Sequence, residues 1–227
     1  MNTTFLRNVG NVLGGAVFLQ KMGTKNRLDF TNCAFWWNHT TASGEAGGAM
    51  FLEGTTPTAA ANAKIVNCTF ALNWNIECDR GPALNVGTYA IGVIYNSIVW
   101  HNHDPVLFAC QGTPPIAGNP TIEYSDIETG WTGAGSDNTF LDPNFVDLFQ
   151  FDLSLQLGSD CIDHADYGRL PKDTLDVDGD GDANEDLPID LAGSERFVDV
   201  DDVIAPDQGA PQGAAWLDMG AYEHPDP

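Results

Sequence analysis

The chain has 227 residues, of which 43% are hydrophobic and 18% charged, so it is long and apolar enough for one sizeable core. Its 32 acidic and 9 basic residues give a formal net charge of −23, which excludes a nucleic-acid binder that works by neutralising phosphates. The same charge disfavours acidic polysaccharides unless cations bridge the two. No run of about 18 apolar residues occurs, so we expect no membrane span.

A seven-residue repeat begins at residue 2 and returns three times. Each copy reads Asn, two residues, a large apolar residue, two residues and Asn. The copies are NTTFLRN (2–8), NCAFWWN (32–38), NCTFALN (67–73) and NSIVWHN (96–102). Their first asparagines are 30, 35 and 29 residues apart, a period typical of stacked supersecondary units.

The apolar pattern around each first asparagine predicts a bend. Apolar or small residues lie at offsets −2, +1 and +3, and these cannot share one face of a straight strand because strand side chains alternate. A bend at the asparagine resets the alternation, and Asn tolerates the left-handed backbone that such a bend requires. We therefore predict strand, bend, strand and a second turn near the closing asparagine. The closing asparagines are Asn8, Asn38, Asn73 and Asn102.

A third short strand is expected in each turn, at 14–20, 47–54 and 81–87. Three short strands per turn describe an all-β, right-handed parallel β-helix of about four to five coils over residues 1–139. Stacking would place Asn32, Asn67 and Asn96 in a hydrogen-bonded ladder with a spacing of about 4.8 Å. An antiparallel β-sandwich is disfavoured because Asn-Gly and Asp-Gly hairpin turns between matched strands are scarce.

The two ends of the coil are expected to differ, with an open strand edge at the first and a cap at the last. The first repeat begins at residue 2, so we expect the chain to start mid-coil with an open strand edge. We favour further coils before Met1, with end-to-end association of another chain through this N-terminal coil as the alternative. Residues 140–227 are expected to form an irregular, loop-rich C-terminal cap packed on the coils, since a terminal repeat has no neighbour.

Six motifs follow one another in the second half. They are NSIVWHN (96–102), YSDIETGW (124–131), LDPNFVD (141–147), LQLGSDCIDHAD (155–166), DLAGSERFVD (190–199) and DMGAYE (218–223). In this order they resemble the C-terminal portion of bacterial secreted β-helix proteins of the choice-of-anchor Q domain type, within the pectate-lyase-like superfamily. The resemblance implies a right-handed parallel β-helix, export to the cell surface or medium, and usually no established activity. The sequence departs from the family pattern in showing no signal peptide, few coils and no anchoring tail after Pro227.

The segment DVDGDGDANEDLPID (176–190) is the densest group of carboxylates. Alternating aspartates in a glycine-turned loop can converge on one hard cation, which prefers several oxygen ligands. The spacing matches the first half of an EF-hand loop, with Gly181 at its turn, but Leu187 stands where a bidentate Glu belongs. Glu185, Asp186 or Asp190 can complete the set, and we choose Asp186. The predicted structural Ca²⁺ ligands are Asp176, Asp178, Asp180, Asp182 and Asp186, and a solvated acidic loop without metal is the open alternative.

Five cysteines occur, at positions 33, 68, 78, 110 and 161. Cys33 and Cys68 fall at the small inward offset, where buried cysteine acts as a small hydrophobe, and we expect them to be reduced. Cys161 is expected to pack under the cap. Cys78 and Cys110 lie in loops and are the candidate disulfide pair of an exported protein.

Tryptophans supply a candidate glycan-binding surface. Trp36 and Trp100 occupy the same offset in different coils, and Trp74 lies close by. If this offset points outward, the rings can stack on sugars; if it points inward, they are core. Both interpretations stay open from the sequence, with a polysaccharide or cell-surface glycan as the expected partner in the first case.

These features favour an extracellular or cell-surface module with a structural, adhesive or glycan-contacting role, stabilised by calcium. One alternative is a polysaccharide lyase or glycoside hydrolase of the β-helix type. His101 and His103 with Asp104 can form a base and its orienter, but a polar turn is the favoured interpretation of these residues. The other alternative is a self-assembling surface or filament subunit that stacks through open coil ends.

Overall fold

A computed structural model describes residues 1–21, 27–41, 47–76, 81–103, 111–198 and 216–225. Over these residues the chain forms a parallel β-solenoid of about three turns without an α-helix, which confirms the predicted all-β coil. None of the described segments forms a helix of the length and apolar character needed to cross a membrane.

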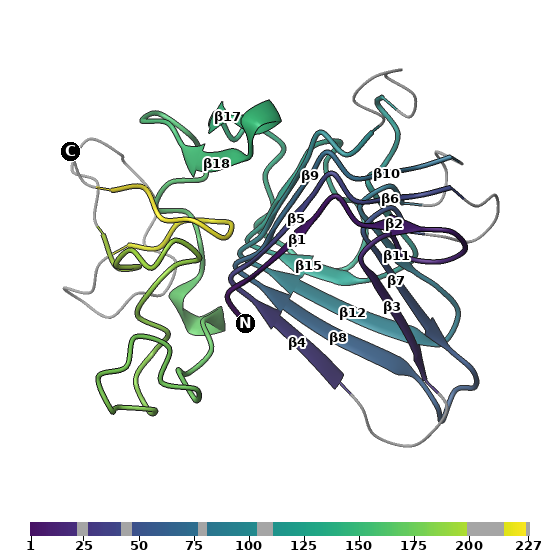
Figure 1. The fold of residues 1–227 in the computed structure, drawn as a ribbon, viewed down its shortest axis with the longest axis horizontal. Coiled ribbons are helices and arrows are strands. Elements are labelled where there is room, and N and C mark those ends of the chain that lie inside the picture. Colours follow the sequence, from purple (N-terminus) through teal and green to yellow (C-terminus); the bar gives the residue numbers. More distant parts are fainter. Residues whose placement is uncertain (22–26, 42–46, 77–80, 104–110, 199–215, 226–227) are drawn as a thin grey trace.

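Four parallel sheets build the coil, with strands that recur in the same order along the chain (Figure 1). Sheet A contains β1 (Thr3–Leu6), β5 (Cys33–Trp36), β9 (Thr69–Ala71), β13 (Ile98–Trp100) and β16 (Asp126–Ile127). Sheet B contains β2 (Val9–Gly10), β6 (His39–Thr40) and β10 (Trp74–Asn75). Sheet C contains β3 (Val17–Lys21), β7 (Met50–Gly54), β11 (Leu84–Val86) and β14 (Ile116–Ala117). Sheet D contains β4 (Arg27–Thr31), β8 (Ala61–Val66), β12 (Ala90–Tyr95) and β15 (Thr121–Glu123). The short strands of sheet B were not expected, because two-residue strands leave no period-two signal.

The passages from sheet D to sheet A that lead into β5, β9 and β13 bend at an asparagine in the left-handed conformation, and the passage into β16 bends at Tyr124, with φ 49°. The φ angle is 49° at Asn32, 48° at Asn67 and 51° at Asn96. A second left-handed residue precedes each closing asparagine. Trp37 with φ 56° and Leu72 with φ 55° turn the chain there from sheet A to sheet B. The repeat therefore encodes two successive corners, as its spacing predicts.

The register places equivalent side chains above one another inside the coil. The rings of Phe5, Phe35 and Phe70 stack at centroid distances of 4.5 and 4.3 Å, close to the spacing of neighbouring strands. Beside them, the N–H of Cys33 donates to Cys68 Sγ at 3.4 Å. Cys33, Cys68 and Cys161 are free and buried, whereas Cys78 and Cys110 lie outside the described residues.

The C-terminal layer, residues 140–225 as far as they are described, lies beside the coils at the corner between sheets D and A (Figure 1). It contains the antiparallel strands β17 (Phe145–Asp147) and β18 (Asp152–Leu155), and the 3₁₀ turns η2 (Leu148–Gln150) and η3 (Tyr167–Arg169). Its apolar side chains pack on the outward-facing residues of sheet A from successive turns, among them Ala34, Ala71 and Ile98. The layer thus covers the flank of the coil over several turns.

The corner asparagines attach this layer. The Nδ2 groups of Asn32, Asn67 and Asn96 donate to backbone carbonyls of Ile189, Asp218 and Asp166 at 2.7, 3.2 and 2.9 Å. Along the predicted ladder, the described residues show one link, from Asn96 Nδ2 to Asn67 Oδ1 at 3.4 Å.

The continuous asparagine ladder lies at the other corner. It runs through Asn8, Asn38, Asn73 and Asn102, with amide-to-amide distances of 2.8, 2.9 and 2.8 Å. These side chains are directed along the stack, whereas those at the first corner are turned toward the C-terminal layer.

Candidate metal centre

The acidic loop is closed at its base by short antiparallel pairing. Lys172 and Asp186 form a bridge, and the N–H of Asp173 donates to the carbonyl of Glu185 at 2.9 Å. The buried carboxylate of Asp173 also accepts the N–H of Val177 at 2.7 Å. Asp173 is therefore held at the entrance of the loop and directed toward it.

Two overlapping groups of carboxylates converge in this loop. Oxygens of Asp176, Asp178 and Asp180 lie within 4.8 Å of one another, and so do oxygens of Asp173, Asp178 and Glu185. Asp178 belongs to both groups and is the centre of the arrangement.

The backbone of the loop follows the turn that the glycines predict. Gly179 and Gly181 have φ angles of 77° and 93°, a region open to glycine without steric cost. The carboxylate of Asp176 accepts the N–H of Gly181 at 3.0 Å across the turn. The chain thereby curls around the carboxylates of the first group.

The electrostatics of the loop suit a cation. Burial, followed by the nearby charges of Asp180 and Asp178, raises the pKa of Glu185. Its Oε1 atom is enclosed and accepts no hydrogen bond from the part of the chain that the structure describes. An all-oxygen set with uncompensated negative charge is the donor chemistry of a hard cation such as Ca²⁺.

The carboxylates that converge differ from the predicted ligand set at two positions. Asp186 lies outside both groups because it pairs with Lys172 at 2.7 Å and accepts the hydroxyl of Tyr167. Asp182 also lies outside them and accepts the N–H of Asn184 at 2.9 Å. Glu185, which the sequence offered as an alternative, belongs to the second group. Asp173 was missed because it precedes the alternating run and reaches the loop only through the pairing at its base.

The three tryptophans do not form one exposed face. Trp36 is 2% exposed, and its Nε1 donates to the carbonyl of Leu148 at 2.8 Å beneath the C-terminal layer. Trp100 is half-buried against the same layer. Trp74 is partly exposed and stacks on His39, with ring centroids 4.3 Å apart. Trp36 is therefore a core residue and offers no surface to a sugar.

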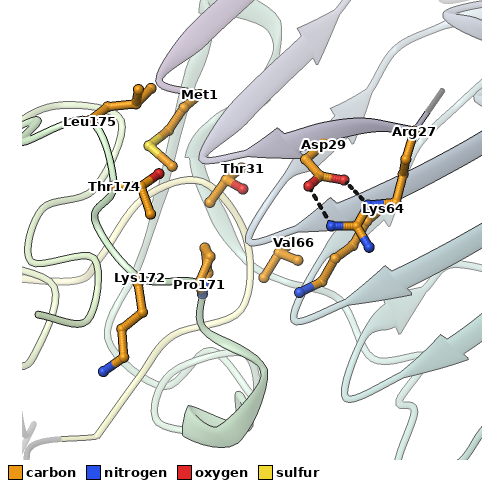
Figure 2. Close-up of a pocket in the computed structure, with 10 residues that line it drawn as sticks. All are labelled: Met1, Arg27, Asp29, Thr31, Lys64, Val66, Pro171, Lys172, Thr174 and Leu175. Atoms are coloured by element: carbon orange, nitrogen blue, oxygen red, sulfur yellow. Dashed lines mark hydrogen bonds and ion pairs between the residues drawn. The ribbon is translucent and has the colours of Figure 1, made fainter. Parts of the chain in front are cut away.

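A cleft of about 360 Å³ separates sheet D from the segment that leads into the acidic loop (Figure 2). Arg27, Lys64 and Lys172 line it, three of the nine basic residues of this acidic chain. Arg27 is engaged by Asp29 through two contacts of 2.6 and 2.7 Å, and Lys172 by Asp186. Lys64 extends from β8, and burial together with the charge of Arg27 lowers its pKa.

Searches of protein-family models, curated proteins and solved structures returned no match to this chain. The assignment of its fold therefore depends on the observed parallel register of sheets A to D. On that evidence the chain is identified by its architecture, a parallel β-solenoid with a laterally attached C-terminal layer and an acidic loop.

Proposed function

We propose that this chain is an extracellular or cell-surface β-solenoid module with a structural role, stabilised by Ca²⁺ in the acidic loop. The observation that carries the proposal is the convergence of two carboxylate groups on Asp178. Without a cation these side chains repel one another at short distance, and a divalent ion converts that repulsion into attraction.

The position of the loop explains how a bound ion would act on the whole module. The loop belongs to the C-terminal layer, whose backbone is hydrogen-bonded to Asn32, Asn67 and Asn96 on successive turns. A cation that holds the loop together would therefore strengthen the layer that covers the coil flank. Ligands that bind the folded state alone raise stability by mass action, by about 2.7 kcal/mol at a concentration of 100 Kd.

The same proposal includes the finer features of the fold. The coils are right-handed, as about 98% of connections between parallel strands are. They number four to five when the short parallel pairing of Ala134 with Thr121 and of Thr139 with Asp126 counts as a further turn. The module belongs with the exported β-helix proteins of the choice-of-anchor Q type, whose ordered motifs it resembles.

Calcium titration tests this proposal. We expect saturable Ca²⁺ binding by calorimetry and a lower melting temperature after chelation with EGTA. Asp178→Asn should abolish both effects because Asp178 belongs to both groups, whereas Asp182→Asn, a matched loss of charge in the same loop, should preserve them. A melting temperature that is indifferent to Ca²⁺ and EGTA would refute the calcium role.

A second candidate is contact with an acidic glycan at the cleft between sheet D and the C-terminal layer. The net charge of −23 opposes such a ligand elsewhere, but Lys64 lines this cleft between two basic residues that are paired, Arg27 with Asp29 and Lys172 with Asp186. A panel of uronate-containing oligosaccharides should bind the wild type and bind Lys64→Gln more weakly, with Arg7→Gln as a control outside the cleft. Release of shortened or unsaturated sugars would instead identify a lyase or hydrolase.

End-to-end association remains a prediction with a physical basis in the first turn. Strands β1, β2, β3 and β4 lie at the edges of their sheets, and Leu6, Val9 and Phe18 are exposed there. Sedimentation at increasing protein concentration tests it, since a monomer at every concentration would argue against stacking.

A further inference from the structure

Three potential metal ligands meet where the chain leaves sheet A after β13 and β16, far in sequence from the acidic loop. They are His101, His103 and Glu128, and their ligand atoms lie within 4.8 Å of one another. Nδ1 of His101 is 4.0 Å from Oε1 of Glu128, and the two imidazole centroids are 4.1 Å apart. The histidines follow β13 and the glutamate follows β16, so neighbouring turns of the coil bring the three together.

The backbone that carries the histidines is held rigidly. Asn102, between them, is buried and makes four side-chain hydrogen bonds of 2.8 to 3.1 Å. It is the last member of the continuous asparagine ladder described above. Glu128 is held on the neighbouring turn by its backbone N–H, which donates to the carbonyl of Val99 at 3.1 Å. Ligands fixed by such supporting bonds are a property of functional metal sites.

The coil itself does not require these residue types. One turn earlier, the register places Trp100 at the position of Glu128, Leu72 at that of His101 and Trp74 at that of His103. Trp100, Leu72 and Trp74 therefore satisfy the same corner one turn earlier, and a histidine returns at the His103 position only one turn further back, as His39. Two imidazoles and a carboxylate appear together where the structure has no packing need for them.

The surroundings enclose the group on one side and place a further negative charge beside it. His101 is half-buried, so its imidazole is partly shielded from water. The edge of the Phe149 ring closes one side of His101 at a centroid distance of 5.8 Å. Asp142 adds a nearby negative charge, which acts on both His101 and Glu128 and favours a cation between them.

We propose that His101, His103 and Glu128 form a binding site for a divalent transition-metal ion, with Zn²⁺ as the expected occupant. Two imidazoles and one carboxylate are a known set of three protein ligands for zinc, in which the fourth coordination position is left for water or a substrate. Tetrahedral zinc at about 2.0–2.2 Å from each ligand separates ligand atoms by about 3.4 Å, so the side chains need to approach by roughly 1.4 Å at most. This site is independent of the acidic loop, whose oxygen-only donors suit Ca²⁺.

Zn²⁺ titration in the presence of excess Ca²⁺ tests the site, because Ca²⁺ occupies the oxygen-rich loop and leaves the imidazole site free. We expect one saturable Zn²⁺ equivalent by calorimetry. We also expect Co²⁺, used as a spectroscopic substitute, to give the visible absorption of a metal with nitrogen ligands. Glu128→Gln and His101→Asn should each weaken Zn²⁺ binding by about 100-fold or more, since even the loss of a residue that only orients a metal ligand costs about 10–100-fold. Asn is chosen at position 101 because it tolerates the left-handed backbone.

Two controls sharpen the result. His164→Gln removes an imidazole outside the group, and Asp178→Asn disrupts the acidic loop, so both should bind Zn²⁺ as the wild type does. Glu128→Gln keeps the size of the side chain and an acceptor oxygen. If His101→Asn does not fold, the Zn²⁺ affinity of Glu128→Gln alone tests the site. The proposal is overturned if the wild type shows no saturable Zn²⁺ binding in excess Ca²⁺, or if Glu128→Gln binds with unchanged affinity.

Discussion

The asparagine ladder at the second corner predicts a graded response to mutation along the coil. The side chain of Asn73, which is fully buried, takes part in four hydrogen bonds. It accepts from the N–H and Nδ2 of Asn38 at 3.0 and 2.9 Å, and donates to the carbonyl of Phe35 and to Asn102 Oδ1, both at 2.8 Å. Asn73→Ala removes all four and leaves buried partners unsatisfied.

The magnitude follows from the number of bonds. At about 1 kcal/mol net for each hydrogen bond, Asn73→Ala should lower the free energy of unfolding by about 4 kcal/mol. Asn8 occupies the equivalent position in the first turn, but it is exposed, and its side chain donates one bond of the ladder, to Asn38 Oδ1 at 2.8 Å. Asn8→Ala should therefore cost about 1 kcal/mol or less, since solvent replaces an exposed bond.

Urea denaturation followed by circular dichroism measures both changes, and thermal melting gives a second measure. For a chain of this length, each kcal/mol corresponds to about 2–4 °C, so Asn73→Ala should melt about 8–16 °C below the wild type. Equal losses at positions 8 and 73, or a loss below about 1 kcal/mol at position 73, would show that the ladder does not stabilise the stack as its burial indicates.

Two further predictions concern the C-terminal layer. Arg196→Ala should lower the free energy of unfolding by about 3–5 kcal/mol in urea denaturation, because it leaves buried Glu223 without the guanidinium that lies 3.2 Å away. Arg169→Ala breaks a partly exposed pair with Glu123 and should lower it by about 1 kcal/mol or less. Equal losses for the two variants would contradict this account. Burial raises the pKa of Asp218 from 3.8 to about 7, so the folded state holds this proton more tightly than the unfolded chain. Its contribution to stability is therefore present at low pH and is lost as pH rises from about 4 to about 7, by up to ~1.4 kcal/mol per pH unit. Unfolding measured across this range should show a shallower slope for Asp218→Asn, and identical slopes would disprove the assignment.

The coil could be predicted from the sequence because its determinants are local and repeated. Asn32 and Asn67 occupy the left-handed corners that their spacing from Phe35 and Phe70 requires. The alternating aspartates likewise indicated the acidic loop, since Asp176 and Asp178 are near neighbours in the chain. Each of these inferences uses residues within a few positions of one another, where backbone geometry alone limits the arrangement.

The residues that the sequence could not place have neighbours from another part of the chain. Trp36 shares an offset with Trp100, but whether that offset meets water depends on the C-terminal layer, which buries Trp36 against Leu148. Asp186 is close to the aspartate run in sequence, yet it pairs with Lys172 and does not converge with Asp178. No short-range pattern distinguishes these outcomes.

By itself the sequence determined the period, the corners and the inward faces of the coil, because side-chain alternation and left-handed asparagines act within each turn. Only the tertiary structure decided which flank the C-terminal layer covers and which groups meet there. Asp173 lies close to Glu185, and Glu128 lies close to His101, although each pair comes from separate segments of the chain. The relative positions of such segments depend on how the whole molecule packs.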